Sequence, residues 1–231
     1  MLEQELHWER GLFFFLNGSD SVFWDNFFWI YTHIPTWIPF YLSLLFVIVY
    51  KKNWKEIGWA LLTVVLVILL TDQISGHIFK PLFHRFRPTW HPDFMNQVDI
   101  VFGYRGGKYG FISGHATNSF GLATLTALLF RNRLFTGVIL MFAILNGYSR
   151  IYIGVHFISD VVVGALVGVA VGYAGYLFYN WGRFRFFHIN KEELKNPAFP
   201  AWEINIPCFL YGLSLLILLL FNNQIVNLIG K

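Results

Sequence analysis

The chain has 231 residues, of which 56% are hydrophobic, 20% aromatic and only 13% charged. That composition is too apolar for a water-soluble surface, so it excludes a soluble globular domain and indicates an integral membrane protein. The formal net charge of +4 is small, and basic residues in membrane proteins usually mark loops or headgroup contacts, so no nucleic-acid partner is expected.

The N-terminal part of the chain, residues 1–33, mixes aromatic side chains with acidic ones such as Glu9 and Asp25. This mixture favours helices over 3–16 and 21–33 that lie in the membrane interface, although the same residues could also form a weak first span.

Six later runs are long and apolar enough to cross about 30 Å of hydrocarbon as helices. They cover roughly 34–50, 56–79, 112–130, 134–149, 158–182 and 204–224. None shows the alternation of a barrel strand, so the predicted fold is an all-α, polytopic membrane helical bundle. We expect one membrane domain over 1–231, with a motif-bearing core at about 56–182 and an additional C-terminal span.

Short basic loops set the expected orientation, because such loops usually face the cytoplasm. Three loops carry the relevant side chains, which are Lys51, Lys52, Lys55, Arg131, Arg133, Arg183, Arg185, Lys191 and Lys195. The segments 80–111 and 149–157 must then face outward, yet 80–111 is basic too. Charges that hold an anion explain this exception better than topology signals do.

Three polar clusters converge on that outward face: "KPLFHRFRP", "ISGH" and "SRIYIGVHFISD". Their cations Lys80, Arg87 and Arg150 suit a phosphate, for which arginine offers bidentate contacts. Ser113 and the amide of Gly114 add neutral donors where a helix begins, and the positive end of the helix dipole favours an anion there.

The third cluster also holds a histidine and an aspartate at i, i+4 spacing, His156 and Asp160. On a helix the carboxylate can hold one ring nitrogen while the other points outward, which is how a histidine nucleophile is oriented. His115, next to the predicted donors, then remains as the general acid for a leaving alkoxide.

On these residues the chain resembles the type 2 phosphatidic acid phosphatase family. Lys80 with Arg87 and Pro88 matches its first signature, and Ser149 with Arg150, His156 and Asp160 its third. The second signature is Pro-Ser-Gly-His, and here Ile112 replaces the proline before Ser113, Gly114 and His115. Since that proline carries no catalytic group, the change should affect only how the helix begins.

The resemblance implies a metal-independent lipid phosphate phosphatase that works through a phosphohistidine and needs no cofactor. His156 would attack phosphorus and His115 would protonate the leaving oxygen, then activate water. The five phosphate-binding groups would stabilise the equatorial oxygens. A phosphotransferase using the same intermediate is the alternative, and an anion channel or transporter a weaker one, because it leaves the His156–Asp160 pair unexplained.

The shared site does not separate lipid A, undecaprenyl diphosphate, phosphatidylglycerophosphate and phosphatidate. The loop with Arg105 and Lys108 is the expected selector, and its basic residues favour lipid A slightly. We expect a multi-pass protein of the bacterial inner (cytoplasmic) membrane whose site faces the periplasm. The lipid substrate and the bilayer are its expected partners, with no obligate protein partner evident.

Further polar and small residues receive plainer interpretations. Arg85, inside the first cluster, is expected to meet only lipid headgroups. Asp72, inside a span, should pair either within the bundle or near Lys80. The residues Gly164, Gly168 and Gly172 form a small-xxx-small ladder that should let a neighbouring helix approach closely.

Overall fold

The computed structural model describes residues 7–187, 189, 198–199 and 202–229, and this part of the chain is helical apart from loops and one isolated bridge between Phe86 and Tyr109. The α-helices are α1 (His7–Leu16), α2 (Val22–Tyr31), α3 (Ile38–Val49), α4 (Trp54–Gln73), α5 (Lys80–Phe83), α6 (Gly114–Phe130), α7 (Arg133–Tyr152), α8 (Ile158–Phe186) and α9 (Asn205–Ile229). The predicted all-α membrane bundle is confirmed.

Shorter helical turns link these helices and shape the end of the bundle. A 3₁₀ turn at Ile34–Trp37 leads into α3, and a π-helical stretch at Ile74–Phe79 joins α4 to α5 without a break. Three more 3₁₀ turns lie in the long loop before α6, at Pro88–Trp90, Met95–Gln97 and Val101–Gly103.

The expected count of six spans is not confirmed. Four helical stretches of the described chain are long and apolar enough to cross a membrane: Trp54–Phe83, Arg133–Tyr152, Ile158–Phe186 and Asn205–Leu228. A fifth span is possible if Val22–Tyr31 and Ile34–Val49, which meet at a bend of 74°, count as one. Helix α6 has 17 residues and falls just short of the same length.

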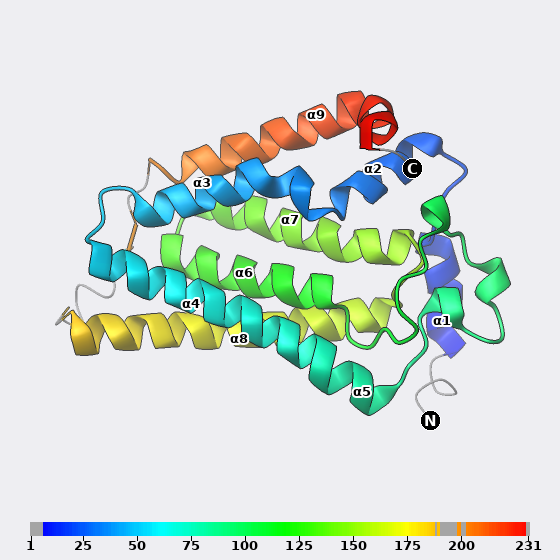
Figure 1. Ribbon diagram of the computed structural model, residues 1–231, viewed down its shortest axis with the longest axis horizontal. Coiled ribbons are helices and arrows are strands. Elements are labelled where there is room, and N and C mark those ends of the chain that lie inside the picture. The colour runs from blue at the N-terminus through cyan, green and yellow to red at the C-terminus, as the bar shows by residue number, and fades with distance from the viewer. Residues whose placement is uncertain (1–6, 188, 190–197, 200–201, 230–231) are drawn as a thin grey trace.

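The interior of the bundle is built around α6, which packs against α8, α7 and α4 (Figure 1). The glycine ladder of α8 makes the closest of these contacts possible. A Cβ atom on Gly164 would lie 2.8 Å from the carbonyl oxygen of Ser113, at the start of α6. The interpretation of this ladder as a packing device is therefore confirmed.

A second group of helices, α2, α3 and α9, packs together along one side of this centre. Helix α2 is therefore part of the bundle, and its side chains Phe27, Phe28 and Ile30 are buried. Helix α2 forms a bent pair with α3 and packs on α9 and α7, and of the two expectations for 21–33, an interfacial helix or a weak first span, neither is decided by this packing.

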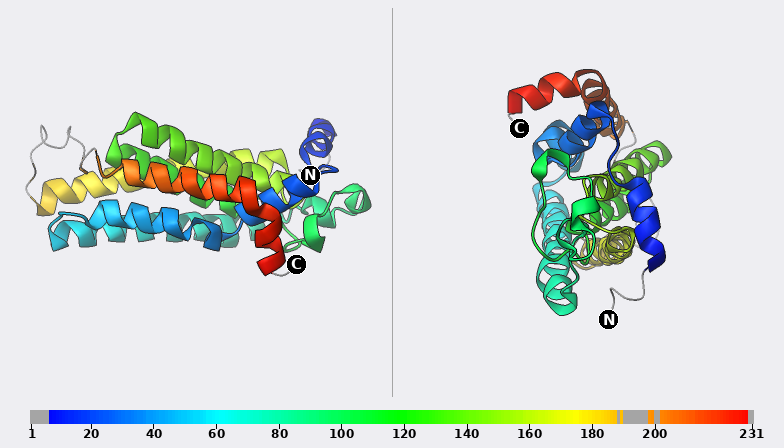
Figure 2. Two further views of the ribbon diagram at one scale, coloured as in Figure 1. Left: turned by 90° about the horizontal axis from the view of Figure 1, so that it is seen from above. Right: turned by 90° about the vertical axis from the view of Figure 1, so that its right-hand side faces the viewer.

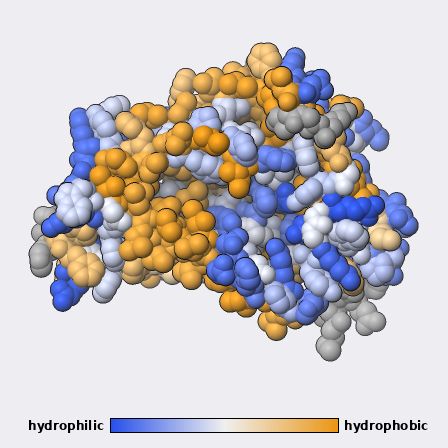
Figure 3. Space-filling view, viewed as in Figure 1, coloured by the Kyte–Doolittle hydropathy of each residue, from blue (hydrophilic) through white to orange (hydrophobic). Residues whose placement is uncertain are grey.

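One end of the bundle carries the loop 84–113 and helix α1, which lies across that end (Figure 2). Hydrophilic residues gather over this end in the space-filling view, whereas hydrophobic residues cover much of the helical middle (Figure 3). Residues 3–6 of the expected N-terminal helix, and Lys191 and Lys195 of the expected cytoplasmic loop, lie outside the described residues. The boundaries proposed for a single domain stay a prediction.

Candidate active site

The three sequence clusters come together at this end of the bundle. Lys80 begins α5, Arg150 lies in the last turn of α7, and Asp160 lies in the first turn of α8. Lys80 interacts electrostatically with Arg87, Arg150 and Asp160. His115, in the first turn of α6, lies within electrostatic range of His156 and the same cations. The fold thus assembles charged groups that are up to 80 residues apart (160 − 80).

The histidine and aspartate of the third cluster meet, although not along one helix as predicted: His156 lies in the turn before α8, and only Asp160 is helical. The Nδ1 atom of His156 lies 3.3 Å from Oδ2 of Asp160, and both side chains are buried. The same oxygen accepts a 3.0 Å hydrogen bond from the backbone N–H of Phe157, so Asp160 also caps α8. A carboxylate that is fixed in this way holds the ring with its other nitrogen, Nε2, free.

A short turn between α7 and α8 places this histidine. Gly154 has a φ of 80°, a conformation that side-chain-bearing residues rarely adopt. The turn lets the amides of Val155 and His156 both donate to the carbonyl oxygen of Arg150, at 3.1 and 3.2 Å. The two predicted site residues His156 and Arg150 are therefore tied together through the backbone.

The protonation of His156 suits a nucleophile. Burial, followed by the positive charges of Arg87 and Arg150, holds the pKa of the His156 imidazole well below its usual range. The ring is therefore neutral at physiological pH, and one nitrogen keeps the electron pair that attack on phosphorus needs.

Two buried arginines of the predicted phosphate site each have one donor without a partner in the described part of the chain. Nε of Arg87 donates to the Tyr109 carbonyl oxygen at 3.2 Å, and Nη1 of Arg150 donates to Oγ1 of Thr32 at 2.7 Å. Nη1 of Arg87 and Nε of Arg150 are buried and have no hydrogen-bond partner among the described residues. Because buried donors are normally satisfied, these two N–H groups fit an anion better than they fit a purely structural role.

The second cluster keeps its expected place despite the missing proline. Ile112 is fully buried, and Ser113 is the N-cap of α6, where its side chain accepts from the Ala116 amide at 3.4 Å. The Ser113 amide donates to the Asp160 carbonyl oxygen at 2.9 Å. Gly114 then starts the helix beside this cap, so the second cluster begins next to Asp160 in the first turn of α8.

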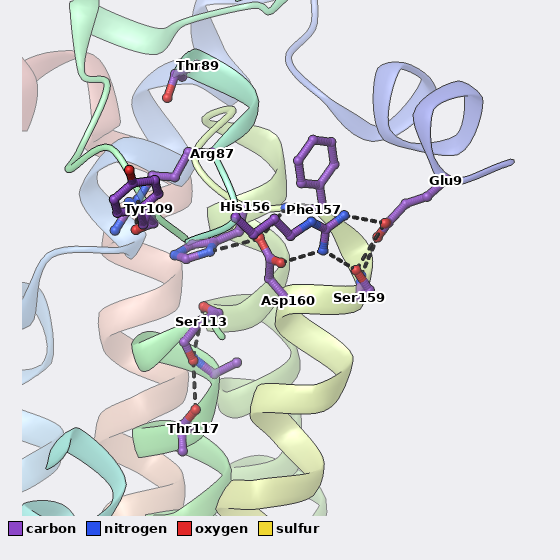
Figure 4. A network of polar contacts seen from close by, with 12 residues as sticks. Glu9, Arg87, Thr89, Tyr109, Ser113, Thr117, His156, Phe157, Ser159 and Asp160 are labelled. Atoms are coloured by element: carbon purple, nitrogen blue, oxygen red, sulfur yellow. Dashed lines mark hydrogen bonds and ion pairs between the residues drawn. The ribbon is translucent and has the colours of Figure 1, made fainter. Parts of the chain in front are cut away.

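The interpretation of Arg85 as a headgroup contact is wrong. Its side chain is only 5% exposed and forms ion pairs with Asp160 and Glu9, at 2.7 and 2.8 Å. The labelled Glu9, Ser159 and Asp160 surround this guanidinium (Figure 4). The position of Arg85 inside the first cluster was the one signal in the sequence. Glu9 gave none, since its pairing joins residues 76 apart.

Sequence reasoning also missed Gly110, which lies against the His156–Asp160 pair. A Cβ atom on this residue would approach Cγ of Arg87 to 2.8 Å, and Nδ1 of His156 and Oδ2 of Asp160 to 3.4 Å. The absence of a side chain at this position is therefore a condition for the site's geometry.

The basic loop residues and Asp72 have more ordinary surroundings. Arg105 donates to the Thr89 carbonyl oxygen at 2.9 Å, so part of its role is to hold the loop. Lys108 is exposed, with its ammonium 5.2 Å from the Phe86 ring. Asp72 is exposed and interacts electrostatically with Lys80, which favours the second of its two expected roles. Contact of the loop with substrate stays a prediction.

A cavity of about 370 Å³ extends from His115 into the bundle. It is lined mainly by apolar side chains of α3, α4, α6 and α7. On α6 the lining residues recur at helical spacing and so form one stripe running away from the site: His115, Asn118, Ser119, Leu122 and Thr126. An apolar space that begins at a catalytic candidate can take a hydrocarbon chain.

The described residues contain no group of three His, Cys, Asp or Glu side chains arranged to hold a metal ion. Metal independence nevertheless stays a prediction, which the chelator experiment below tests.

This fold and site define a membrane-embedded phosphoric ester hydrolase. The family model of the PAP2 superfamily matches residues 57–184, so the chain belongs to that superfamily. This confirms the resemblance drawn from the three motifs.

Comparison with individual proteins agrees with this assignment. The chain is 47% identical to the lipid A 4'-phosphatase of Porphyromonas gingivalis, over 80% of this chain and 78% of the relative. It is 39% identical to the lipid A 4'-phosphatase of Bacteroides thetaiotaomicron, over 73% and 74%. The crystal structure of Aquifex aeolicus LpxE matches with a TM-score of 0.55 and 25% identity, covering 74% of this chain and 96% of that one.

Proposed function

We propose that the chain hydrolyses the phosphate ester of a membrane lipid through a phosphohistidine on His156, and that lipid A is its preferred substrate. The observation that carries the mechanism is the buried His156–Asp160 pair beside two arginines with unpaired donors. The preference for lipid A is supported by the names of the two relatives and by the basic loop with Arg105 and Lys108.

In the first step Nε2 of His156 attacks phosphorus while the bond from phosphorus to the lipid oxygen breaks. Asp160 stabilises the imidazolium that develops, and His115 gives its proton to the departing oxygen. In the second step water attacks the phosphohistidine, His115 takes a proton from that water, and inorganic phosphate leaves. Lys80, Arg87 and their neighbours stabilise the equatorial oxygens in both steps.

The apolar cavity beside His115 supports a lipid as the substrate of this reaction. With the phosphate between the arginines, an attached hydrocarbon chain would enter the space between α3, α4 and α6. A small water-soluble phosphate ester would use the charged site alone.

Phosphate release by the detergent-purified protein tests the proposal. Lipid A, undecaprenyl diphosphate, phosphatidylglycerophosphate and phosphatidate are compared, with EDTA present throughout. We expect release from lipid A to be fastest and to survive the chelator. Release that stops with EDTA and returns with magnesium would contradict the mechanism, and release only when an acceptor lipid is added would favour a phosphotransferase.

We further propose that the site faces the periplasm of the inner membrane. Asp93 and Arg105 lie in the loop at the site's end, whereas Asn53 and Asn132 cap helices at the opposite end. Cysteines placed at 93 or 105 should react with an impermeant thiol reagent in intact spheroplasts, and cysteines at 53 or 132 should not. The reverse labelling pattern would overturn this orientation.

A further inference from the structure

A continuous chain of buried charges leads from the N-terminal helix to the nucleophile. Glu9 of α1 accepts from Nη2 of Arg85 at 2.8 Å, and Nη1 of Arg85 donates to Oδ1 of Asp160 at 2.7 Å. Asp160 in turn holds His156 through its other oxygen. Glu9 is 1% and Arg85 5% exposed, so both charges are shielded from water.

The two carboxylate oxygens of Asp160 contact different partners. Oδ1 faces Arg85, while Oδ2 faces His156 and the Phe157 amide. A carboxylate that is bonded on both oxygens cannot rotate about its last torsion without losing a charge-assisted hydrogen bond. Arg85 therefore fixes the direction in which Asp160 presents its charge to the imidazole.

Arg85 is itself held from several sides. Nη1 also donates to Oγ of Ser159 at 2.6 Å, and the guanidinium carbon lies 4.4 Å from the centre of the Phe157 ring. Glu9 accepts from the amide and the hydroxyl of Ser159 as well, so one carboxylate ties α1 to the first turn of α8. Phe13 adds an apolar contact, its ring centre 5.4 Å from that of Phe157.

The charge balance gives Glu9 more than a structural role. One guanidinium between two carboxylates leaves a single net negative charge on the buried group. When His156 attacks phosphorus its imidazole becomes cationic, and that remaining negative charge stabilises it. Without Glu9 the Arg85–Asp160 pair would be neutral overall, and the imidazolium would lose that attraction in a medium of low dielectric constant.

We propose that Arg85 and Glu9 are positioning residues of the active site, which act on His156 through Asp160, and that helix α1 is therefore part of the catalytic machinery. This inference rests on the proposed function, in which His156 is the nucleophile. It extends the site beyond the three sequence motifs, to a segment that precedes the matched family region of 57–184.

The test measures phosphoenzyme formation and steady-state turnover of a nitrophenyl phosphate by the full-length protein in detergent. The variants are Glu9→Gln, which keeps the size and removes the charge, Arg85→Ala, and Arg85→Lys, which keeps the charge and loses the planar fork. Glu56→Gln and Arg183→Lys, at the opposite end of the bundle, are the matched controls.

We expect Arg85→Ala to lower kcat about 10–100-fold, the usual effect of removing a partner that orients a catalytic side chain, with KM changed less than about twofold. Arg85→Lys should recover part of the loss. Glu9→Gln should lower kcat and move the acid limb of the kcat/KM profile to lower pH, because an imidazolium with less negative charge nearby is harder to form. The controls should keep both values.

Folded Glu9→Gln and Arg85→Ala proteins with wild-type kcat and an unmoved acid limb would overturn the inference. The inference would also be overturned if kcat in the Glu9 and Arg85 variants fell no further than in the controls and only in proportion to their loss of thermal stability. His156→Ala is measured alongside. If that variant still forms phosphoenzyme, the proposed function fails; if it is inactive while the Glu9 and Arg85 variants are normal, only this inference fails.

Discussion

Two arginine–carboxylate clusters lie at opposite ends of α8, and they differ in how tightly they are built. At the start of the helix, Arg85 meets two carboxylates at 2.7 and 2.8 Å. Near its end, Nε of Arg183 lies 3.7 Å from Glu56, beyond hydrogen-bond distance. Both arginines also lie near an aromatic ring, at 4.4 Å from Phe157 and 5.7 Å from Tyr179.

This difference indicates what the end of the bundle with the candidate active site requires. Asp160 and Arg183 lie about 35 Å apart along α8. The two clusters therefore belong to the same helix but are too far apart to contact the same ligand. Only the first contains buried charges whose geometry is fixed by several hydrogen bonds. Buried charges are costly unless they are paired, and we infer that the cost is retained where orientation matters for catalysis.

The largest expected contrast is between an arginine at each end. Arg150→Ala removes a donor that we place on the equatorial phosphate oxygens, so kcat should fall about 10²–10³-fold. Arg183→Ala should change kcat less than about twofold. Rates per folded molecule, normalised by size-exclusion chromatography, check this. Equal losses in the two variants would remove the functional distinction between the ends.

A smaller effect is expected from one methyl group. Gly110→Ala would push against Arg87 and the catalytic pair, and a displacement of this kind should lower kcat about 10–100-fold. Gly107→Ala, in the same loop, meets nothing within 4 Å and is the control. Comparison of the two turnover numbers decides the point, and a normal Gly110→Ala enzyme would show that the loop adapts.

The cavity should affect lipids and spare small substrates. Leu122→Trp fills the space beside His115, so KM for the lipid should rise several-fold while nitrophenyl phosphate turnover stays unchanged. Leu166→Trp, on an exposed position of α8, introduces the same side chain outside the cavity. An equal rise of KM in both variants would argue against a hydrocarbon chain in this space.

The smallest effect concerns stability and pH. Because the pKa of His156 is lowered in the folded protein, the unfolded chain takes up a proton near pH 6.5 that the folded chain does not. The free energy of unfolding should therefore fall as pH drops below about 6.5, by up to about 1.4 kcal/mol per pH unit for this group. His156→Asn should unfold with a shallower pH dependence in thermal melts between pH 5 and 7; an unchanged dependence would contradict the lowered pKa.

Much of this architecture could be predicted from the sequence, because apolar runs and motif spacings are local patterns. The helices α4, α6, α7 and α8 lie where their runs predicted, and His156 and Asp160 pair as expected, although His156 lies in the turn before α8 and not on the helix. The count of six spans is not confirmed, because α6 has 17 residues and falls just short of the length of a span, and because the apolar run before α4 bends by 74° between α2 and α3, which leaves little trace in hydropathy.

The partners of buried charges could not be predicted. Arg85 looked like any arginine at a membrane surface, and its two carboxylates come from residues 76 positions before it and 75 after it. Such pairings depend on how helices meet at the end of the bundle, which no local pattern encodes. Glu9 illustrates the limit most clearly, because its neighbours in the sequence suggest only an interfacial helix.

The most direct test of the account is to trap the phosphoenzyme with a nitrophenyl phosphate, whose leaving group needs no protonation. His156→Ala should form no acid-labile phosphoprotein. His115→Ala should complete the first step and stall at the second, so phosphoprotein should accumulate, because general acid–base assistance is worth about 10²–10⁴-fold. Phosphoprotein in His156→Ala, together with none in His115→Ala, would show that nucleophile and acid are assigned the wrong way round.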